Sequence, residues 1–165
     1  MGVHHYQLAL LPSAFADDAS DDLWEREDLW SEQPPSALLR ELRRLLPKET
    51  SWGPVEEFES ASDWASDLRI WHDGQRDGPV ESIVFRFSPV ADSREVLERF
   101  LIRAARHGLL VYARASRCIL QPRIEIIERD LKQSTAYRFI SDPLAALLEA
   151  AANVKMPEQK ISKLD

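Results

Sequence analysis

The stretch Pro79–Tyr112, PVESIVFRFSPVADSREVLERFLIRAARHGLLVY, reads as a strand, a helix and a second strand in succession. Apolar and polar side chains alternate along the residues after Pro79, which is typical of a strand with one buried face. Such a strand needs a cover for its apolar face, and the helix that follows can supply one. The buried face is expected to carry Ile83, Phe85 and Phe87, and the other face Ser82, Val84 and Arg86.

The helix within this stretch carries signals at both of its ends. Asp92 is predicted to be the N-cap residue, and Glu95 three positions later would complete a capping box. Gly108 is expected to end the helix, because glycine accepts the left-handed backbone that follows many helices. The helix is therefore expected to pack on the strand, with a short apolar strand, Leu109–Ala113, after it. Its apolar stripe comprises Val96, Leu97, Phe100, Leu101 and Ala104.

The remaining chain adds further strands and helices around this unit. The expected order is strand, helix, strand, strand, helix, strand, which is typical of an α+β, ferredoxin-like (split βαβ) fold. Its mainly antiparallel sheet would have helices on one face, and a C-terminal helical extension would follow Ala113. The additional elements are expected at His4–Leu11 (strand), between Pro35 and Pro47 (helix), at 52–62 (irregular or edge strand), at Asp67–His72 (strand), near 124–131 (helix) and from Asp142 (helix).

Length and composition indicate one globular domain. The chain has 165 residues and is 44% hydrophobic, and its polar tail at 154–165 is expected to fray. It opens without a secretory signal pattern, and no apolar run approaches the roughly 20 residues of a membrane span. We therefore expect a single domain over residues 1–165, in the cytoplasm and without a membrane partner. The one cysteine, Cys118, adjoins two apolar residues and is expected to be buried and unreactive.

Acidic residues are concentrated in the first half of the chain. Residues 1–80 hold 17 Asp and Glu against 7 Lys and Arg, while residues 81–165 hold 11 against 14, and the net charge is −7. Such an acidic half repels nucleic acid and favours a basic protein partner.

The most acidic segment is an insertion at 17–33, with eight carboxylates, two tryptophans and one basic residue, Arg26. One interpretation is a solvated loop whose tryptophans tuck onto the core. The other is an acidic arm that binds a basic protein, because tryptophan supplies buried contact area and carboxylates speed encounter. The predicted partner-binding residues are Asp21, Asp22, Trp24, Glu25, Asp28 and Trp30.

The sheet face turned away from the helices is the second candidate site. One interpretation is that the extension after Ala113 covers it. The other is that its side chains line a groove for a ligand or a partner, and the sequence leaves open whether the protein is a monomer or a homodimer. The possible ligand residues are His5, Gln7, Arg69, Trp71 and Arg86.

Known catalytic signatures are missing from the sequence. It has no glycine-rich phosphate loop, no His and Cys spacing typical of a metal site and no nucleophile elbow. No catalytic residue, metal site or cofactor is therefore predicted. An enzyme acting on an anionic substrate is a further alternative, with Arg69, His72, Asp73 and Arg86 as its residues.

A set of short packing and turn motifs runs along most of the chain: Leu45-Leu46-Pro47, Ser51-Trp52-Gly53, Asp63-Trp64, Ser66–Trp71, Ile83–Arg86 and Asp142-Pro143. Together they resemble small uncharacterised bacterial proteins of the toxin-immunity type, which are found beside secreted toxins. The resemblance implies a non-catalytic, cytoplasmic module that binds and occludes a toxin, and it brings no catalytic residue. This immunity function is the leading hypothesis. A small-ligand or regulatory domain that uses the open sheet face is the alternative.

Overall fold

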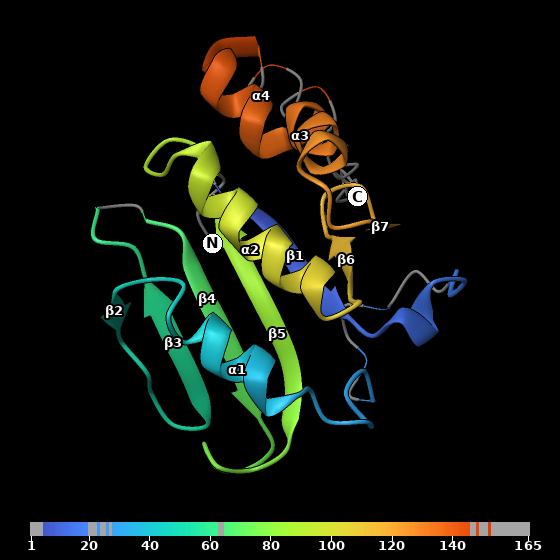
Figure 1. Ribbon diagram of the computed structural model, residues 1–165. Helices are drawn as coiled ribbons and strands as arrows, with labels where there is room; N and C mark the ends of the chain where they lie inside the picture. The colour runs from blue at the N-terminus through green and yellow to red at the C-terminus, as the bar shows by residue number, and fades with distance from the viewer. Residues whose placement is uncertain are drawn as a thin grey trace, which may run out of the picture.

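The computed structural model describes residues 5–19, 23, 26, 28–62, 65–145, 148 and 152. The strands are β1 (Tyr6–Leu11), β2 (Lys48–Glu49), β3 (Val55–Glu59), β4 (Asp67–His72), β5 (Val80–Phe87), β6 (Leu110–Ala113) and β7 (Cys118–Leu120); the helices are α1 (Ser36–Leu42), α2 (Arg94–Arg106), α3 (Ile124–Gln133) and α4 (Thr135–Ser141), with a 3₁₀ turn at Ser13–Phe15. Helices α1 and α2 lie across one face of the sheet, and α3 and α4 sit together on its β6–β7 side (Figure 1).

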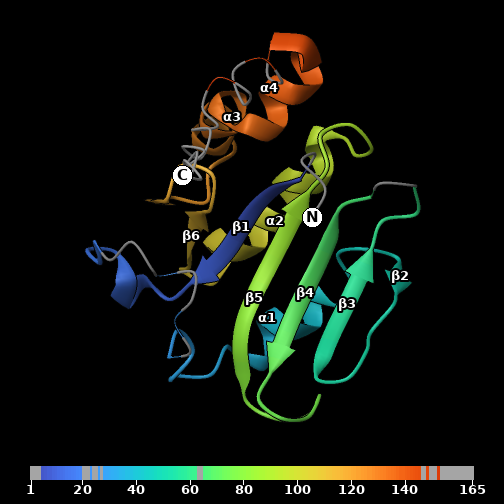
Figure 2. The ribbon, with the colours of Figure 1, turned by 180° about the vertical axis from the view of Figure 1, so that it is seen from behind.

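The centre of the protein is a seven-stranded antiparallel sheet in the order β2-β3-β4-β5-β1-β6-β7. Figure 2 shows it from the side that α1 and α2 leave uncovered. The predicted α+β class and antiparallel sheet are confirmed. The strand expected at 52–62 is β3, and the sheet is wider than expected because β2 extends it beyond β3 at one edge and β7 beyond β6 at the other. Strands as short as β2 and β7, with two and three residues, leave no periodicity to detect in a sequence.

The register between β1, β4 and β5 puts the predicted apolar face of β5 in the core. Phe85 pairs with Leu8 on one side and Leu68 on the other, and its ring stacks on Phe100 of α2 with centroids 4.4 Å apart. Arg86 points to the opposite face. A slip of one residue would exchange the two faces, so the predicted alternation is confirmed. The apolar faces of β1, α1, β5 and α2 were expected to be buried together, and they meet in one cluster that includes Leu8, Leu42, Phe85, Phe87, Phe100 and Leu101.

Helix α2 begins and ends close to the predicted residues, but Asp92 does not cap it. The N-cap position is Ser93, whose side chain makes no capping hydrogen bond. The Asp92 carboxylate instead accepts hydrogen bonds from the backbone N–H of Ser66 (2.7 Å) and the hydroxyl of Ser60 (2.9 Å). Ser66 is fully buried, so its N–H requires an acceptor inside the protein. At the other end of α2, Gly108 has the predicted positive φ, 67°.

The C-terminal extension starts with β7, the edge strand beyond β6. Cys118 pairs there with Ala113 and is exposed, so its predicted burial is wrong: an edge strand is covered by a neighbour on one side only. Helix α3 is held to the sheet by the buried Ile127 and by Tyr6, whose hydroxyl donates to Asp130 at 2.5 Å. Burial and this hydrogen bond raise the pKa of Tyr6 well above its ordinary value.

At the end of the described chain, the predicted N-cap is present, but two apolar residues after it are exposed. Asp142 accepts a hydrogen bond from the backbone N–H of Ala145 at 3.0 Å, which is the predicted N-cap. Leu144 and Leu148, two apolar residues of the helix expected from Asp142, are 69% and 63% exposed, so these two side chains do not pack on the described fold. The predicted frayed tail at 154–165 lies outside the described residues. Within the described residues, no helix combines the length and apolarity needed to cross a membrane.

Candidate functional site

The open face, which is the sheet face opposite α1 and α2, carries two rows of cross-strand neighbours. Opposed residues on antiparallel strands have Cβ atoms about 5 Å apart, so each row joins side chains from distant parts of the chain. The first row consists of Lys48, Glu59, Asp67, Arg86 and Gln7, and the second of Glu57, Arg69, Val84 and Ala9.

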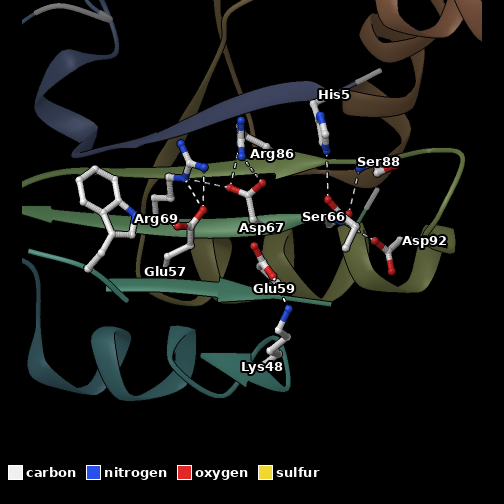
Figure 3. Close-up of polar contacts among 12 residues, drawn as sticks. His5, Lys48, Glu57, Glu59, Ser66, Asp67, Arg69, Arg86, Ser88 and Asp92 are labelled. Atoms are coloured by element: carbon white, nitrogen blue, oxygen red, sulfur yellow. Dashed lines mark hydrogen bonds and ion pairs between the residues drawn. The ribbon is translucent and has the colours of Figure 1, made fainter. Parts of the chain in front are cut away.

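Asp67 holds both arginines of the open face. Its side chain is 5% exposed, and its carboxylate forms a bidentate pair with Arg86, with Nε–Oδ1 at 2.8 Å and Nη2–Oδ2 at 2.6 Å. Arg69 Nε lies 3.3 Å from the same Oδ1. Because both guanidinium groups reach one oxygen atom, they lie next to each other, as Figure 3 shows. A buried carboxylate needs compensating charge, and the two arginines provide it.

Glu57 fixes the second arginine and links it to a pair of tryptophans. Its Oε1 accepts hydrogen bonds from Nε (2.7 Å) and Nη2 (2.6 Å) of Arg69, and its Oε2 accepts one from the indole N–H of Trp52 (2.9 Å). Trp52 packs edge-on against Trp71, with ring centroids 5.6 Å apart. We call the resulting set the open-face network: Trp52, Glu57, Asp67, Arg69 and Arg86.

A hollow of about 270 Å³ lies beside the open-face network. Arg114 lines it, and its Nη1 donates to Gln7 Oε1 at 2.9 Å. No residue of α3 or α4 lines it, so these helices of the extension do not cover this part of the face. The rest of the lining is formed by the two network arginines and by Ala9, Leu29, Trp71, Ser82 and Val84.

The structure brings together most of the residues predicted for this face. His5 is the exception: its Nε2 lies 3.0 Å from the carbonyl oxygen of Ala65, before β4, and it does not line the hollow. The side chains of Arg69 and Arg86 are only 27% and 19% exposed, less than expected for two arginines on an open sheet face. The predicted residues that line the hollow are Gln7, Arg69, Trp71 and Arg86.

The carboxylates of the open face are candidate site residues that the sequence alone does not reveal. Glu57 and Asp67 neutralise Arg69 and Arg86, the two arginines predicted as ligand residues. A signal for Glu57 is present in the alternation of β3, which puts Glu57 and Glu59 on one face and Phe58 on the other. Which strand pairs with β3, and in which register, is not readable from that alternation, so the pairing with Arg69 stays hidden.

Protein-family models, curated proteins and solved structures show no match to this chain. The geometry of the open face and the charges around it are therefore the basis on which a function can be proposed.

Part of the acidic segment 17–33 packs on the rest of the protein, as its described residues show. Leu29 and Trp30 are 2% and 3% exposed and are part of the core cluster, so Trp30 agrees with the interpretation in which the tryptophans tuck onto the core and not with the one in which it anchors a partner. Asp28 is exposed and binds Arg26, with Nη2–Oδ2 at 2.6 Å, and this hydrogen bond holds the pKa of Asp28 below its ordinary value. The other predicted partner-binding residues lie outside the described residues: Asp21, Asp22, Trp24 and Glu25.

The end of this segment is fixed to the first residue of β5. The side-chain amide of Gln33 donates to the carbonyl oxygen of Val80 at 3.1 Å and to that of Trp30 at 2.6 Å. Its amide oxygen accepts a hydrogen bond from the backbone N–H of Val80 at 2.6 Å. Gln33 thus pairs with Val80 as a neighbouring strand would, which keeps Leu29 and Trp30 on the core.

The arginines and His72 lie on opposite faces of the sheet. His72 is buried, with Nε2 2.7 Å from Glu56 Oε1 and Nδ1 2.9 Å from the carbonyl oxygen of Gly78. This geometry separates His72 from Arg69 and Arg86, so His72 does not share a site with the two arginines as the enzyme alternative requires. Among the residues that the structure describes, no group of three or more His, Cys, Asp or Glu could hold a metal ion.

Proposed function

We propose that the protein is a non-catalytic protein-binding module of the immunity type, which binds and occludes a bacterial toxin through its open face. One observation carries this proposal. Trp52, 49% exposed at the rim of the face, packs on Trp71 and is tied through Glu57 to Arg69. Tryptophan and arginine are enriched among the residues that dominate binding energy at protein interfaces. The resemblance to immunity-type proteins suggests the class of partner.

The aromatic and arginine side chains are already ordered before a partner binds. Hydrogen bonds to Glu57 and Asp67 hold Trp52, Arg69 and Arg86 in one arrangement. Ordering a rotamer-rich side chain at an interface costs about 0.5–1.5 kcal/mol, and a preorganised side chain avoids most of that cost. A small patch of this kind therefore supports tight binding.

The charge distribution favours a basic partner. Within the open-face network, two carboxylates offset two arginines, so the net charge of −7 dominates at longer range. A negative protein attracts basic partners and speeds their encounter, most strongly at low salt. The proposed partner is therefore a basic protein, as the acidic segment predicted. It is attracted by the negative charge of the whole surface, and Trp30 is not its anchor.

We also propose that the centre of the sheet is a ferredoxin-like, split βαβ core. The strands β4-β5-β1-β6 are adjacent in this order, and α1 and α2 lie on one face of them. On this proposal, β2, β3 and β7 are additions at the two edges. The proposed fold leaves the opposite sheet face available for binding, where the open-face network lies.

Replacing Trp52 tests the proposed function against a matched control. Trp52 and Ile102 are both 49% exposed, but Ile102 lies on α2, across the sheet from the open face. Used as bait in a pull-down from the native host, the wild type and Ile102→Ala are expected to retain the same basic protein, and Trp52→Ala is expected to lose it. Binding kinetics on the recovered protein should show dissociation faster by about tenfold or more for Trp52→Ala.

Two outcomes would contradict the proposal in different ways. If Trp52→Ala binds the recovered protein as tightly as Ile102→Ala does, the interface lies away from the open face. If the wild type retains no protein that an unrelated acidic bait does not also retain, the binding function itself is wrong.

A further inference from the structure

We propose that the hollow beside the open-face network is a binding site for a small organic monoanion, a carboxylate joined to an apolar body. This goes beyond the proposed function, because it requires no protein partner. The volume of about 270 Å³ lies just below the roughly 300–1,000 Å³ of pockets for drug-sized ligands, so the ligand is small.

The two network arginines offer unused N–H groups to this hollow. Glu57 and Asp67 engage Nε and Nη2 of the guanidinium groups, and no acceptor among the described residues engages Nη1 of Arg69 or Arg86. Figure 3 shows the outer nitrogens of both arginines directed away from the carboxylates that hold them. A ligand carboxylate can accept hydrogen bonds from these groups without breaking the pairs beneath, and such charge-assisted bonds are strong.

The charges around the hollow favour a ligand with a single negative charge. Arg69, Arg86 and Arg114 line it, while Glu57 and Asp67 lie beneath the first two. A monoanion is attracted by the guanidinium groups that face it. For a phosphate dianion, the attraction to these groups and the repulsion from the two carboxylates are both doubled, but the cost of leaving water grows with the square of the charge, which favours the monoanion.

The other side chains of the lining favour an apolar ligand body. Ala9, Leu29 and Val84 supply apolar surface, and Trp71 adds an aromatic ring. Leu29 is held in place because the segment that carries it is anchored by Trp30 and Gln33. Apolar surface around a few fixed polar groups is the usual composition of a small-molecule site.

Benzoate is the probe for this site, with benzamide as its neutral isostere and inorganic phosphate, at a pH above its second pKa, as the dianion. Added to ¹⁵N-labelled protein, benzoate is expected to shift the backbone amide signals of β1, β4 and β5, with a dissociation constant of about 1 mM. Benzamide and phosphate are expected to bind at least about tenfold more weakly. Equal binding of benzamide, or shifts confined to other elements, would overturn the proposal, and tighter binding of phosphate would overturn the choice of a monoanion.

Variants at the border and in the lining of the hollow test its location. Arg69 and Arg86 are kept, because removing either leaves a buried carboxylate uncompensated. Arg114→Met is expected to weaken benzoate binding by about tenfold, and Val84→Phe, which fills the hollow, to abolish it. Arg40→Met, on α1 across the sheet, is the matched control and should bind as the wild type does.

Near-UV circular dichroism establishes that each variant is folded before its affinity is compared. Wild-type affinity in a folded Val84→Phe variant would overturn the proposed site. None of these outcomes depends on the pull-down with Trp52→Ala, so the ligand site and the protein-binding function can fail independently.

Discussion

At the level of single residues, two buried carboxylates control the open face. The side chains of Glu57 and Asp67 are 8% and 5% exposed. Taking such an ion out of water costs several kcal/mol, which well-formed partners must offset. Arg69 and Arg86 are those partners, together with the indole N–H of Trp52. The arginines are therefore positioned by the sheet, which gives the face a defined shape before any ligand or partner binds.

Asp67→Asn is expected to lower the free energy of unfolding by on the order of 2–4 kcal/mol, because Arg86 loses its bidentate partner. Urea denaturation at neutral pH measures the change. The control is Glu59→Gln, which removes an open-face carboxylate that is 32% exposed and paired with Lys48. It should cost less than about 1 kcal/mol, as partly exposed pairs do. Equal losses in the two variants would show that the buried pair adds little to stability.

Glu56 forms a second charge cluster, on the face that the helices cover. Its carboxylate accepts hydrogen bonds from Arg43 at 2.6 and 2.7 Å, and His72 Nε2 lies 2.7 Å away. Burial raises the pKa of Glu56, but the hydrogen bonds from Arg43 and His72 outweigh burial and hold the pKa below its ordinary value. The ionised form of Glu56 is therefore favoured by folding.

The lowered pKa of Glu56 predicts a loss of stability in acid. Its stabilising contribution is fully present above the unfolded-state pKa of about 4.5 and is lost as the pH falls through the lower folded-state pKa. Glu56→Gln should therefore be less stable than the wild type at neutral pH, and the difference should shrink below about pH 4.5. Urea denaturation at a series of pH values measures this.

Glu95→Gln, at an exposed position in the first turn of α2, controls for the removal of one titratable group. A constant difference between Glu56→Gln and the wild type across the whole pH series would exclude Glu56 as a source of acid sensitivity.

At the level of elements, arginine side chains of α2 link this helix to α1 through hydrogen bonds. Arg99 Nη2 donates to the carbonyl oxygen of Leu45 at 3.1 Å, and Arg103 Nε donates to that of Glu41 at 3.2 Å. These carbonyls lie at the C-terminal end of α1 and in the turn after it, where few intrahelical partners remain and cations are favourable. Burial lowers the pKa of Arg103 below its ordinary value. The arginines of α2 are thus structural links to α1.

Phe100→Ala is expected to lower the free energy of unfolding by about 3–5 kcal/mol, because the ring is fully buried and stacks on Phe85. Ile102→Ala, two residues along the same helix, is the control; at 49% exposure it should change stability by less than about 1 kcal/mol. Thermal and urea denaturation of both variants provide the comparison. Similar losses for the two would mean that α2 does not pack through Phe100.

At the scale of the whole molecule, the acidic segment 17–33 has two roles. Its described large apolar residues, Leu23, Leu29 and Trp30, are buried in the core. Asp28 stays on the surface, next to Arg26. The segment therefore adds negative charge to the surface while closing part of the core, and deleting it would remove both.

Trp30→Ala is expected to lower the free energy of unfolding by about 3–5 kcal/mol, as other large-to-small core replacements do. Trp30→Phe should cost less, because it keeps most of the ring and removes an indole N–H that has no acceptor among the described residues. Asp28→Asn, on the surface of the same segment, should change stability by less than about 0.5 kcal/mol. Thermal denaturation compares the three, and full stability in Trp30→Ala together with lost partner binding would restore the anchor interpretation.

The local sequence pattern was sufficient to predict the strands β1, β4, β5 and β6 and the helix α2. The alternation around Phe85 and Arg86 predicts which side chain is buried, because the faces of a strand follow from a period of two. The turn glycine Gly108 is equally local, since its backbone conformation depends on the few residues around it.

Only the tertiary structure determined which charged side chains pair with each other on the open face. Arg69 and Arg86 are visible as a basic pair in the sequence, but their neutralisation by Glu57 and Asp67 depends on the register between β3, β4 and β5, which the turns and core packing set together. Trp30 is visible only as a tryptophan among carboxylates. Whether it anchors a partner or fills the core depends on a contact with distant strands, and the composition of a segment carries no information about that contact.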